Sequence, residues 1–98
     1  MKIKHNISEF VDSLTIQMAT KHLVDRIVNR RKEMKLTQIE LAKRSGVSYA
    51  SIRRFEISGE ISLHSLMKIA NAINCLKDFK KLFVDESDAN LKDFTYQL

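Results

Sequence analysis

The sequence contains few of the residues that interrupt helices or cross-link a chain. Among its 98 residues there are no prolines, two glycines and one cysteine. Proline and glycine both destabilise the interior of a helix, so their scarcity favours an all-α fold. The single cysteine, Cys75, cannot form an intramolecular disulfide, which is typical of proteins in a reducing compartment.

Long apolar runs are also missing. Polar residues such as Lys2, Lys4, Asn6 and Glu9 break up the N-terminal stretch, so it lacks the continuous apolar segment of a signal peptide. No other run is long and apolar enough to cross a bilayer. We therefore expect a cytoplasmic protein with no membrane partner. The length suits one domain with a modest core and disfavours an enzyme with a deep substrate pocket.

The charge is unevenly distributed along the chain. The formal net charge is +5. Residues 85–98 contain four acidic residues against Lys92 and carry −3, which leaves +8 on residues 1–84. A basic domain with an acidic tail is compatible with a polyanionic partner such as nucleic acid, although many ordinary domains are equally basic.

Apolar spacing and capping residues predict five helical segments. Residues 1–18 are expected to form an N-terminal arm or the start of a helix, and residues 84–98 an acidic tail. Met1 to Ile7 alternates loosely, as in a short strand or an extended arm. In the domain between them, residues 19–83, the predicted helices are Ala19–Lys35, a short helix from Thr37 to Gly46, Tyr49–Ile57, Leu63–Ala72 and Leu76–Phe83.

Several local signals fix these helix ends. Thr37-Gln38-Ile39-Glu40 has the form of a capping box, with a hydroxyl at the N-cap and a glutamate three residues later. Ser48 and Ser62 are predicted to cap the next two helices. Gly46 and Gly59 are predicted to end helices, because glycine adopts a left-handed backbone without a steric penalty.

The pattern also predicts which side of each helix is buried. The first helix is expected to carry Arg26, Arg30, Arg31 and Lys32 on its outer face. The expected inward-facing residues are Leu23, Ile27, Met34, Leu41, Val47, Ile52, Phe55, Leu66, Ile69, Ala70 and Ile73.

The segment from Thr37 to Glu56 satisfies the geometry of two short helices that meet at a steep angle. Ala42 supplies a small side chain where the helices cross, and Gly46 supplies a residue without a Cβ in the tight turn. Buried positions at Leu41, Val47 and Ile52 complete the spacing of a helix-turn-helix.

On these features the chain resembles the lambda-repressor/Cro-like (XRE) family of helix-turn-helix regulators. The resemblance runs from about Arg31 to Ile73. It rests on Leu36-Thr37-Gln38, Glu40-Leu41-Ala42, Gly46-Val47-Ser48, Ile52, Glu56 and Ile69-Ala70. It implies a five-helix, all-α domain that binds double-stranded operator DNA with its third helix in the major groove. In the family a glycine often stands where this chain has Ser58, so we expect the loop before the fourth helix to be one residue longer.

The resemblance also implies roles for individual residues. Base-reading positions fall on Tyr49, Ala50 and Arg54, with Arg53 beside them; the alternative for the two arginines is a solvated helix face. A buried ion pair is expected between Arg31 and Glu56. Candidate phosphate contacts are Thr37, Gln38 and Ser48 at helix starts, and more weakly Lys43, Ser62 and His64.

Assembly and role are less closely constrained by the sequence. Apolar residues of the fifth helix and tail exceed what one small domain can bury, which predicts a homodimer; they are Leu76, Phe79, Leu82, Phe83, Val84, Leu91, Phe94, Tyr96 and Leu98. Within the family the chain looks most like HipB-type antitoxins, which bind a HipA-type kinase toxin. The alternatives are a phage-type repressor, a restriction–modification controller, or a protein-interaction module that no longer binds DNA. The sequence shows no catalytic set, and we expect no metal and no cofactor.

Overall fold

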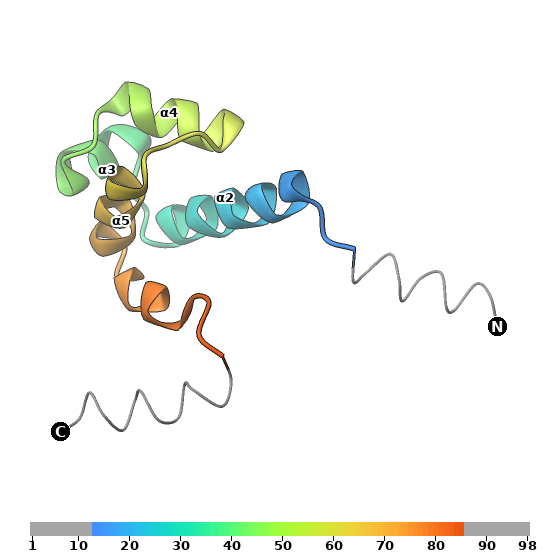
Figure 1. Cartoon of the computed structure of the whole chain (residues 1–98). Helices are drawn as coiled ribbons and strands as arrows, with labels where there is room; N and C mark the ends of the chain where they lie inside the picture. Colours follow the sequence, from blue (N-terminus) through green and yellow to red (C-terminus); the bar gives the residue numbers. More distant parts are fainter. Residues whose placement is uncertain (1–12, 86–98) are drawn as a thin grey trace, which may run out of the picture.

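The computed structural model describes residues 13–85, and all of its regular elements are helical (Figure 1). In chain order they are α2 (Ile16–Glu33), α3 (Gln38–Ser45), α4 (Tyr49–Ser58), α5 (Leu63–Ala72) and the 3-10 helix η1 (Leu76–Lys81). Residues 13–85 contain no strand, so the predicted all-α fold is confirmed. Residues 1–12 of the predicted N-terminal segment 1–18 and residues 86–98 of the predicted acidic tail lie outside the described residues, and residues 16–18 begin α2.

Helix α2 differs from its prediction at both ends and at one buried position. It begins at Ile16, because the Thr15 hydroxyl accepts a hydrogen bond from the Met18 backbone N–H at 3.0 Å. It ends at Glu33 instead of Lys35, whose φ of 59° is incompatible with a right-handed helix. Leu23 was predicted to be buried but is 40% exposed. Its neighbour Val24 is buried instead, whereas Ile27 is buried as predicted and Met34 packs against the core.

Helices α3 and α4 begin and end at the predicted capping residues, which are Thr37 and Gly46 for α3 and Ser48 and Gly59 for α4. The Thr37 hydroxyl accepts from the Glu40 N–H at 3.0 Å, and a Glu40 carboxylate oxygen accepts from the Thr37 N–H at 2.8 Å. The hydrogen bond from the Thr37 N–H stabilises the charged carboxylate and lowers the pKa of Glu40 below its ordinary value. Gly46 ends α3 with a φ of 78°, and Gly59 ends α4 with a φ of 80°.

Of the two helices predicted in the C-terminal part of the domain, the first has the predicted bounds and the second is shorter and of another type. Helix α5 spans Leu63–Ala72, as predicted from Ser62 and the apolar stripe. The last segment was predicted to be helical to Phe83, but it is a short 3-10 helix that ends at Lys81. No side chain caps its start, and none of its residues is fully buried, so little stabilises a longer α-helix there.

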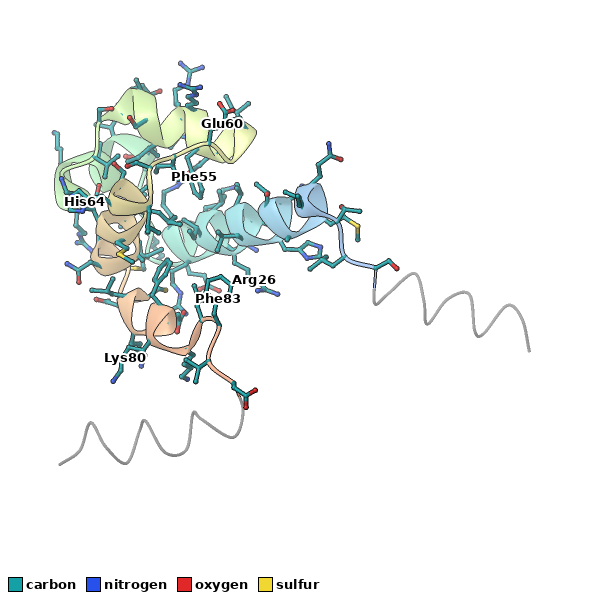
Figure 2. The ribbon with its side chains drawn as sticks, in the orientation of Figure 1. Arg26, Phe55, Glu60, His64, Lys80 and Phe83 are labelled. Carbon is teal, nitrogen blue, oxygen red and sulfur yellow. The ribbon has the colours of Figure 1, made fainter. Side chains whose placement is uncertain are left out.

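A small core joins the four α-helices. Leu41, Ile52, Phe55, Ile69 and Ile73 are each at most 2% exposed. Figure 2 shows Phe55 pointing from α4 toward the other helices. Helix α3 packs against both α4 and α5, and α2 packs against α4. Burial of a side chain of this size contributes roughly 1.5–3 kcal/mol, so this core fixes which face of α4 remains outside.

Candidate nucleic-acid interface

The outer face of α4 carries the four residues predicted to read bases. Tyr49, Ala50, Arg53 and Arg54 are all exposed, whereas Ile52 and Phe55 on the opposite face are buried. The helical period places the four together, and Figure 1 shows α4 at one edge of the domain with its outer side free of other helices. This arrangement is a solvent-facing helix of the width that a DNA major groove admits.

An aromatic ring and a guanidinium lie together at the start of this face. The Arg53 guanidinium carbon is 5.9 Å from the centroid of the Tyr49 ring, within the range of a cation–π contact. Tyr49 is 41% exposed, so its ring remains open to solvent on other sides. The contact restricts both side chains before any partner binds.

Besides Thr15 on α2, three helix starts carry a hydroxyl cap, and these are the three predicted to contact phosphate. Thr37, Ser48 and Ser62 each accept a hydrogen bond from the backbone N–H three residues later, at 3.0, 3.1 and 3.1 Å. The remaining N–H groups of these first turns are available to an anion such as phosphate. Lys43 and His64, the other two proposed phosphate ligands, are exposed on the last turn of α3 and the first turn of α5.

A buried charged network holds α4 to its support. The Arg31 Nε and Nη2 atoms donate to the two Glu56 carboxylate oxygens at 2.8 and 2.9 Å. The Arg31 Nη1 atom donates to the Leu36 carbonyl at 2.8 Å. Gln38 donates from its side-chain amide to Glu56 at 2.8 Å, so this amide faces the protein. The prediction of an outward-facing Arg31 was wrong: Arg31 is 8% exposed, because it bonds Glu56.

Glu60 is a residue that the sequence did not single out. Its carboxylate lies 2.6 Å from Arg54 Nη2, although it follows α4 by two residues. Ser58 is the last residue of α4 and Gly59 caps it, so Glu60 lies in the loop that leads to α5. A contact across a helix-ending turn has no helical or strand periodicity, so no signal in the sequence could have found this ion pair.

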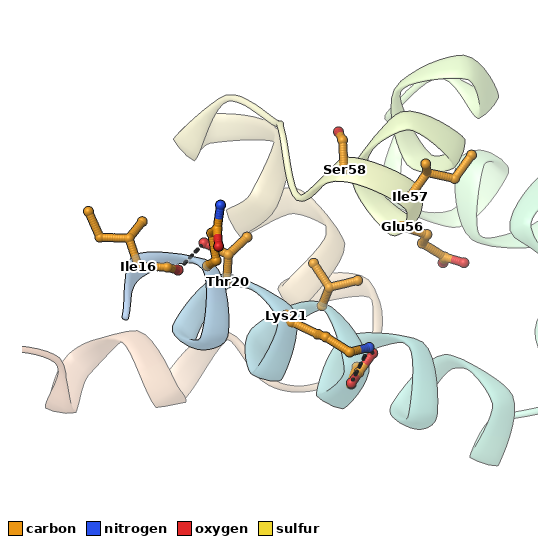
Figure 3. Close-up of a pocket in the computed structure, with 9 residues that line it drawn as sticks. Ile16, Thr20, Lys21, Glu56, Ile57 and Ser58 are labelled. Carbon is orange, nitrogen blue, oxygen red and sulfur yellow. Dashed lines mark hydrogen bonds and ion pairs between the residues drawn. The ribbon is translucent and has the colours of Figure 1, made fainter. Parts of the chain in front are cut away.

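A groove of about 330 Å³ lies between the start of α2 and the end of α4 (Figure 3). The exposed side chains of Ile16 and Ile57 lie on its two sides. Its charged and hydroxyl groups all have partners within the protein: Lys21 with Asp25, Glu56 with Arg31, Thr20 with the Ile16 carbonyl, and Ser58 with the Arg54 carbonyl.

The fold and the exposed face of α4 define a small DNA-binding regulatory domain of the helix-turn-helix class. A family described as "Helix-turn-helix" (HTH_3) matches residues 27–79, more than half of the chain. The chain belongs to this family, the XRE-type helix-turn-helix transcription regulators. Comparison with curated proteins and with solved structures found no match.

Two further features bear on partners. No helix among residues 13–85 is long and apolar enough to cross a membrane. The same residues contain no group of three histidine, cysteine, aspartate or glutamate side chains that could hold a metal ion.

Proposed function

We propose that this protein is a sequence-specific transcriptional repressor that binds double-stranded operator DNA upstream of its own gene. The observation that carries the proposal is the outer face of α4, on which Tyr49, Ala50, Arg53 and Arg54 are all exposed. In this class of domain the second helix of the motif enters the major groove and its N-terminal residues meet the base edges. The two arginines on this face favour DNA over a protein-contact module, whose recognition helix would carry acidic or bulky groups.

Arg54 is the residue proposed to read a base directly. A guanidinium can donate to both acceptors of a guanine at once, and each such contact contributes roughly 1–3 kcal/mol of discrimination. Arg54→Ala should therefore weaken operator binding by about that amount and flatten base preference at one position. Lys43→Ala, which removes a proposed phosphate contact, should weaken binding to all DNA about equally.

The test is a gel shift with promoter DNA from upstream of the gene, competed by random DNA at near-physiological salt. A discrete complex that survives competition, and whose affinity falls steeply with added salt, is the expected result. If Arg54→Ala lost the same affinity for promoter DNA and for random DNA, the proposed role of Arg54 in base reading would be contradicted. Loss of the wild-type complex to random DNA would contradict sequence-specific autorepression itself.

The finer role that we propose is that of an antitoxin of the HipB type. Its support is the resemblance of residues 51–70 and 76–83 to those proteins in sequence. On this proposal the neighbouring gene encodes a HipA-type kinase toxin, and the complex of the two proteins represses the operon. Co-purification of the tagged protein with the product of the adjacent gene, co-expressed from its own promoter, tests the partnership. Independent elution of the two would contradict it.

A further inference from the structure

An acidic side chain is held against the arginine proposed to read DNA. The Arg54 Nη2 and Nε atoms both donate to the same oxygen of Glu60, at 2.6 and 3.1 Å. Glu60 lies at the end of α4 in Figure 2, on the side of the domain opposite Lys80 of η1. The ion pair thus joins the outer face of α4 to the loop that leads to α5.

The backbone of this loop is fixed by its own hydrogen bonds. The Ser58 hydroxyl donates to the Arg54 carbonyl at 2.7 Å and accepts from the Glu60 N–H at 3.1 Å. Gly59 closes the turn in a left-handed conformation, and its N–H donates to the Phe55 carbonyl at 2.8 Å. These contacts fix the backbone of the turn, so the fold itself brings the Glu60 side chain next to Arg54.

The ion pair contributes little to folding. The side chains of Arg54 and Glu60 are 71% and 66% exposed, and exposed ion pairs contribute at most about 1 kcal/mol to stability. A carboxylate on a surface proposed to meet phosphates is, in addition, unfavourable for binding DNA of any sequence. Stability and general DNA affinity therefore both fail to account for Glu60 at this position.

The geometry leaves one edge of the arginine free. A guanidinium has five N–H donors, and Glu60 occupies one on Nε and one on Nη2. Three donors remain, and one on Nη1 together with the second on Nη2 forms the forked edge that matches the O6 and N7 acceptors of guanine. Arg54 can thus hold Glu60 and guanine simultaneously, with its orientation set before DNA arrives.

We propose, on the basis of the DNA recognition by α4 proposed above, that Glu60 is a positioning residue that sets the sequence specificity of Arg54. It holds the free guanidinium edge in the orientation for guanine and prevents Arg54 from swinging to a phosphate. Its negative charge also repels the DNA backbone, which lowers affinity for sequences that offer no compensating base contact.

The test compares Glu60→Gln with the wild type in two assays: selection of binding sites from a random duplex library, and Kd values on the selected and on random DNA. Glu60→Gln should bind random DNA more tightly and lose selectivity by about fivefold or more, the lower end of what one bidentate base contact provides. Its relaxed base preference should fall at the position that Arg54→Ala also relaxes. Its melting temperature should stay at that of the wild type, since the pair is exposed.

Glu33→Gln at the end of α2 is the matched control, because it removes the same charge from an exposed ion pair, with Arg30 at 3.9 Å, and should leave selectivity unchanged. Unchanged selectivity in Glu60→Gln, beside a wild type that selects a defined site, would overturn the role of Glu60 and leave the proposed function standing. Relaxation at a position other than that of Arg54 would also overturn it. A wild type that selects no site would overturn the proposed function and the role of Glu60 together.

Discussion

Glu56 shows how a single charged residue can connect the elements of this small domain. Its carboxylate accepts hydrogen bonds from Arg31 on α2 and from Gln38 at the start of α3 while its side chain is only 9% exposed. A buried charge is tolerated when it is paired and fully hydrogen-bonded, and is costly otherwise. The network therefore ties α4 to α2 and α3.

Glu56→Ala should lower the free energy of unfolding by about 3–5 kcal/mol, because it leaves the buried Arg31 guanidinium without its counterion. Urea denaturation measures the loss. Base preference should change much less, since Glu56 does not lie on the exposed face of α4. The matched control is Glu33→Ala, which breaks an exposed pair with Arg30 at 3.9 Å and should change stability by less than about 1 kcal/mol. A melting temperature equal to that of the wild type in Glu56→Ala would contradict this role.

For individual residues, the sequence predicts hydrogen bonds between close neighbours in the chain better than contacts that depend on the tertiary structure. The caps at Thr37 and Ser48 could be predicted because a capping hydroxyl and its target lie three residues apart. The pairing of Arg31 with Glu56 spans 25 residues, and only the family resemblance indicated it. Glu60 could not be found in either way, because its contact with Arg54 depends on the direction of the turn after α4.

The ends of α3 and α4 depend on two glycines that share a conformation but not an environment. Gly46 and Gly59 have φ values of 78° and 80°. A Cβ atom at Gly46 would meet nothing within 4 Å, whereas one at Gly59 would collide with the Thr20 side-chain methyl of α2. Gly46 is thus required for its backbone alone, and Gly59 also for the close approach of α4 to α2.

Gly46→Ala should destabilise the domain by about 1–2 kcal/mol, the penalty of a left-handed alanine. Gly59→Ala should cost roughly 1–3 kcal/mol more, because overpacking against Thr20 adds to the same backbone penalty. Chemical denaturation of both variants measures the difference. In a Thr20→Ser background, which lacks the methyl group, Gly59→Ala should approach the cost of Gly46→Ala. Equal losses for the two single variants would contradict the role of the α2 contact.

The limits of prediction at the scale of elements have two physical causes. Helix α5 could be predicted to the residue because its cap and apolar stripe agree. The start of α2 was missed by three residues because the cap at Thr15 precedes the apolar periodicity. The 3-10 helix η1 is short because none of its residues is buried, and the spacing of apolar residues does not show whether a segment will find a surface to pack against. Propensity and spacing identify helices well where capping and packing coincide.

The whole domain presents two chemically different ends. The outer face of α4 is basic and polar. At the other end of the domain in Figure 2, η1 and the residues after it expose apolar side chains, and Phe83 is fully exposed. One recognition helix contacts only a few base pairs, so regulators of this kind commonly pair two domains over half-sites one helical turn apart. An apolar end remote from α4 suits such pairing because it leaves both recognition helices free.

If this apolar end forms the proposed homodimer, the wild type should sediment as a dimer at micromolar concentration. Replacing Leu82 and Phe83 together by serine should shift it toward the monomer, because these side chains are 49% and 101% exposed and would lose their apolar contact with the second copy. Binding to a two-half-site operator should fall far more than binding to a single half-site, since the linkage between the two recognition helices is lost.

The matched control is Ile39→Ser, which removes a 52% exposed apolar side chain from α3 and should leave the dimer intact. A monomeric wild type would contradict the dimer. A double variant that remains dimeric would place the interface elsewhere on the molecule. Equal loss of affinity for one and for two half-sites would mean that the apolar end acts on DNA binding through the fold of each domain, and not through the pairing of two.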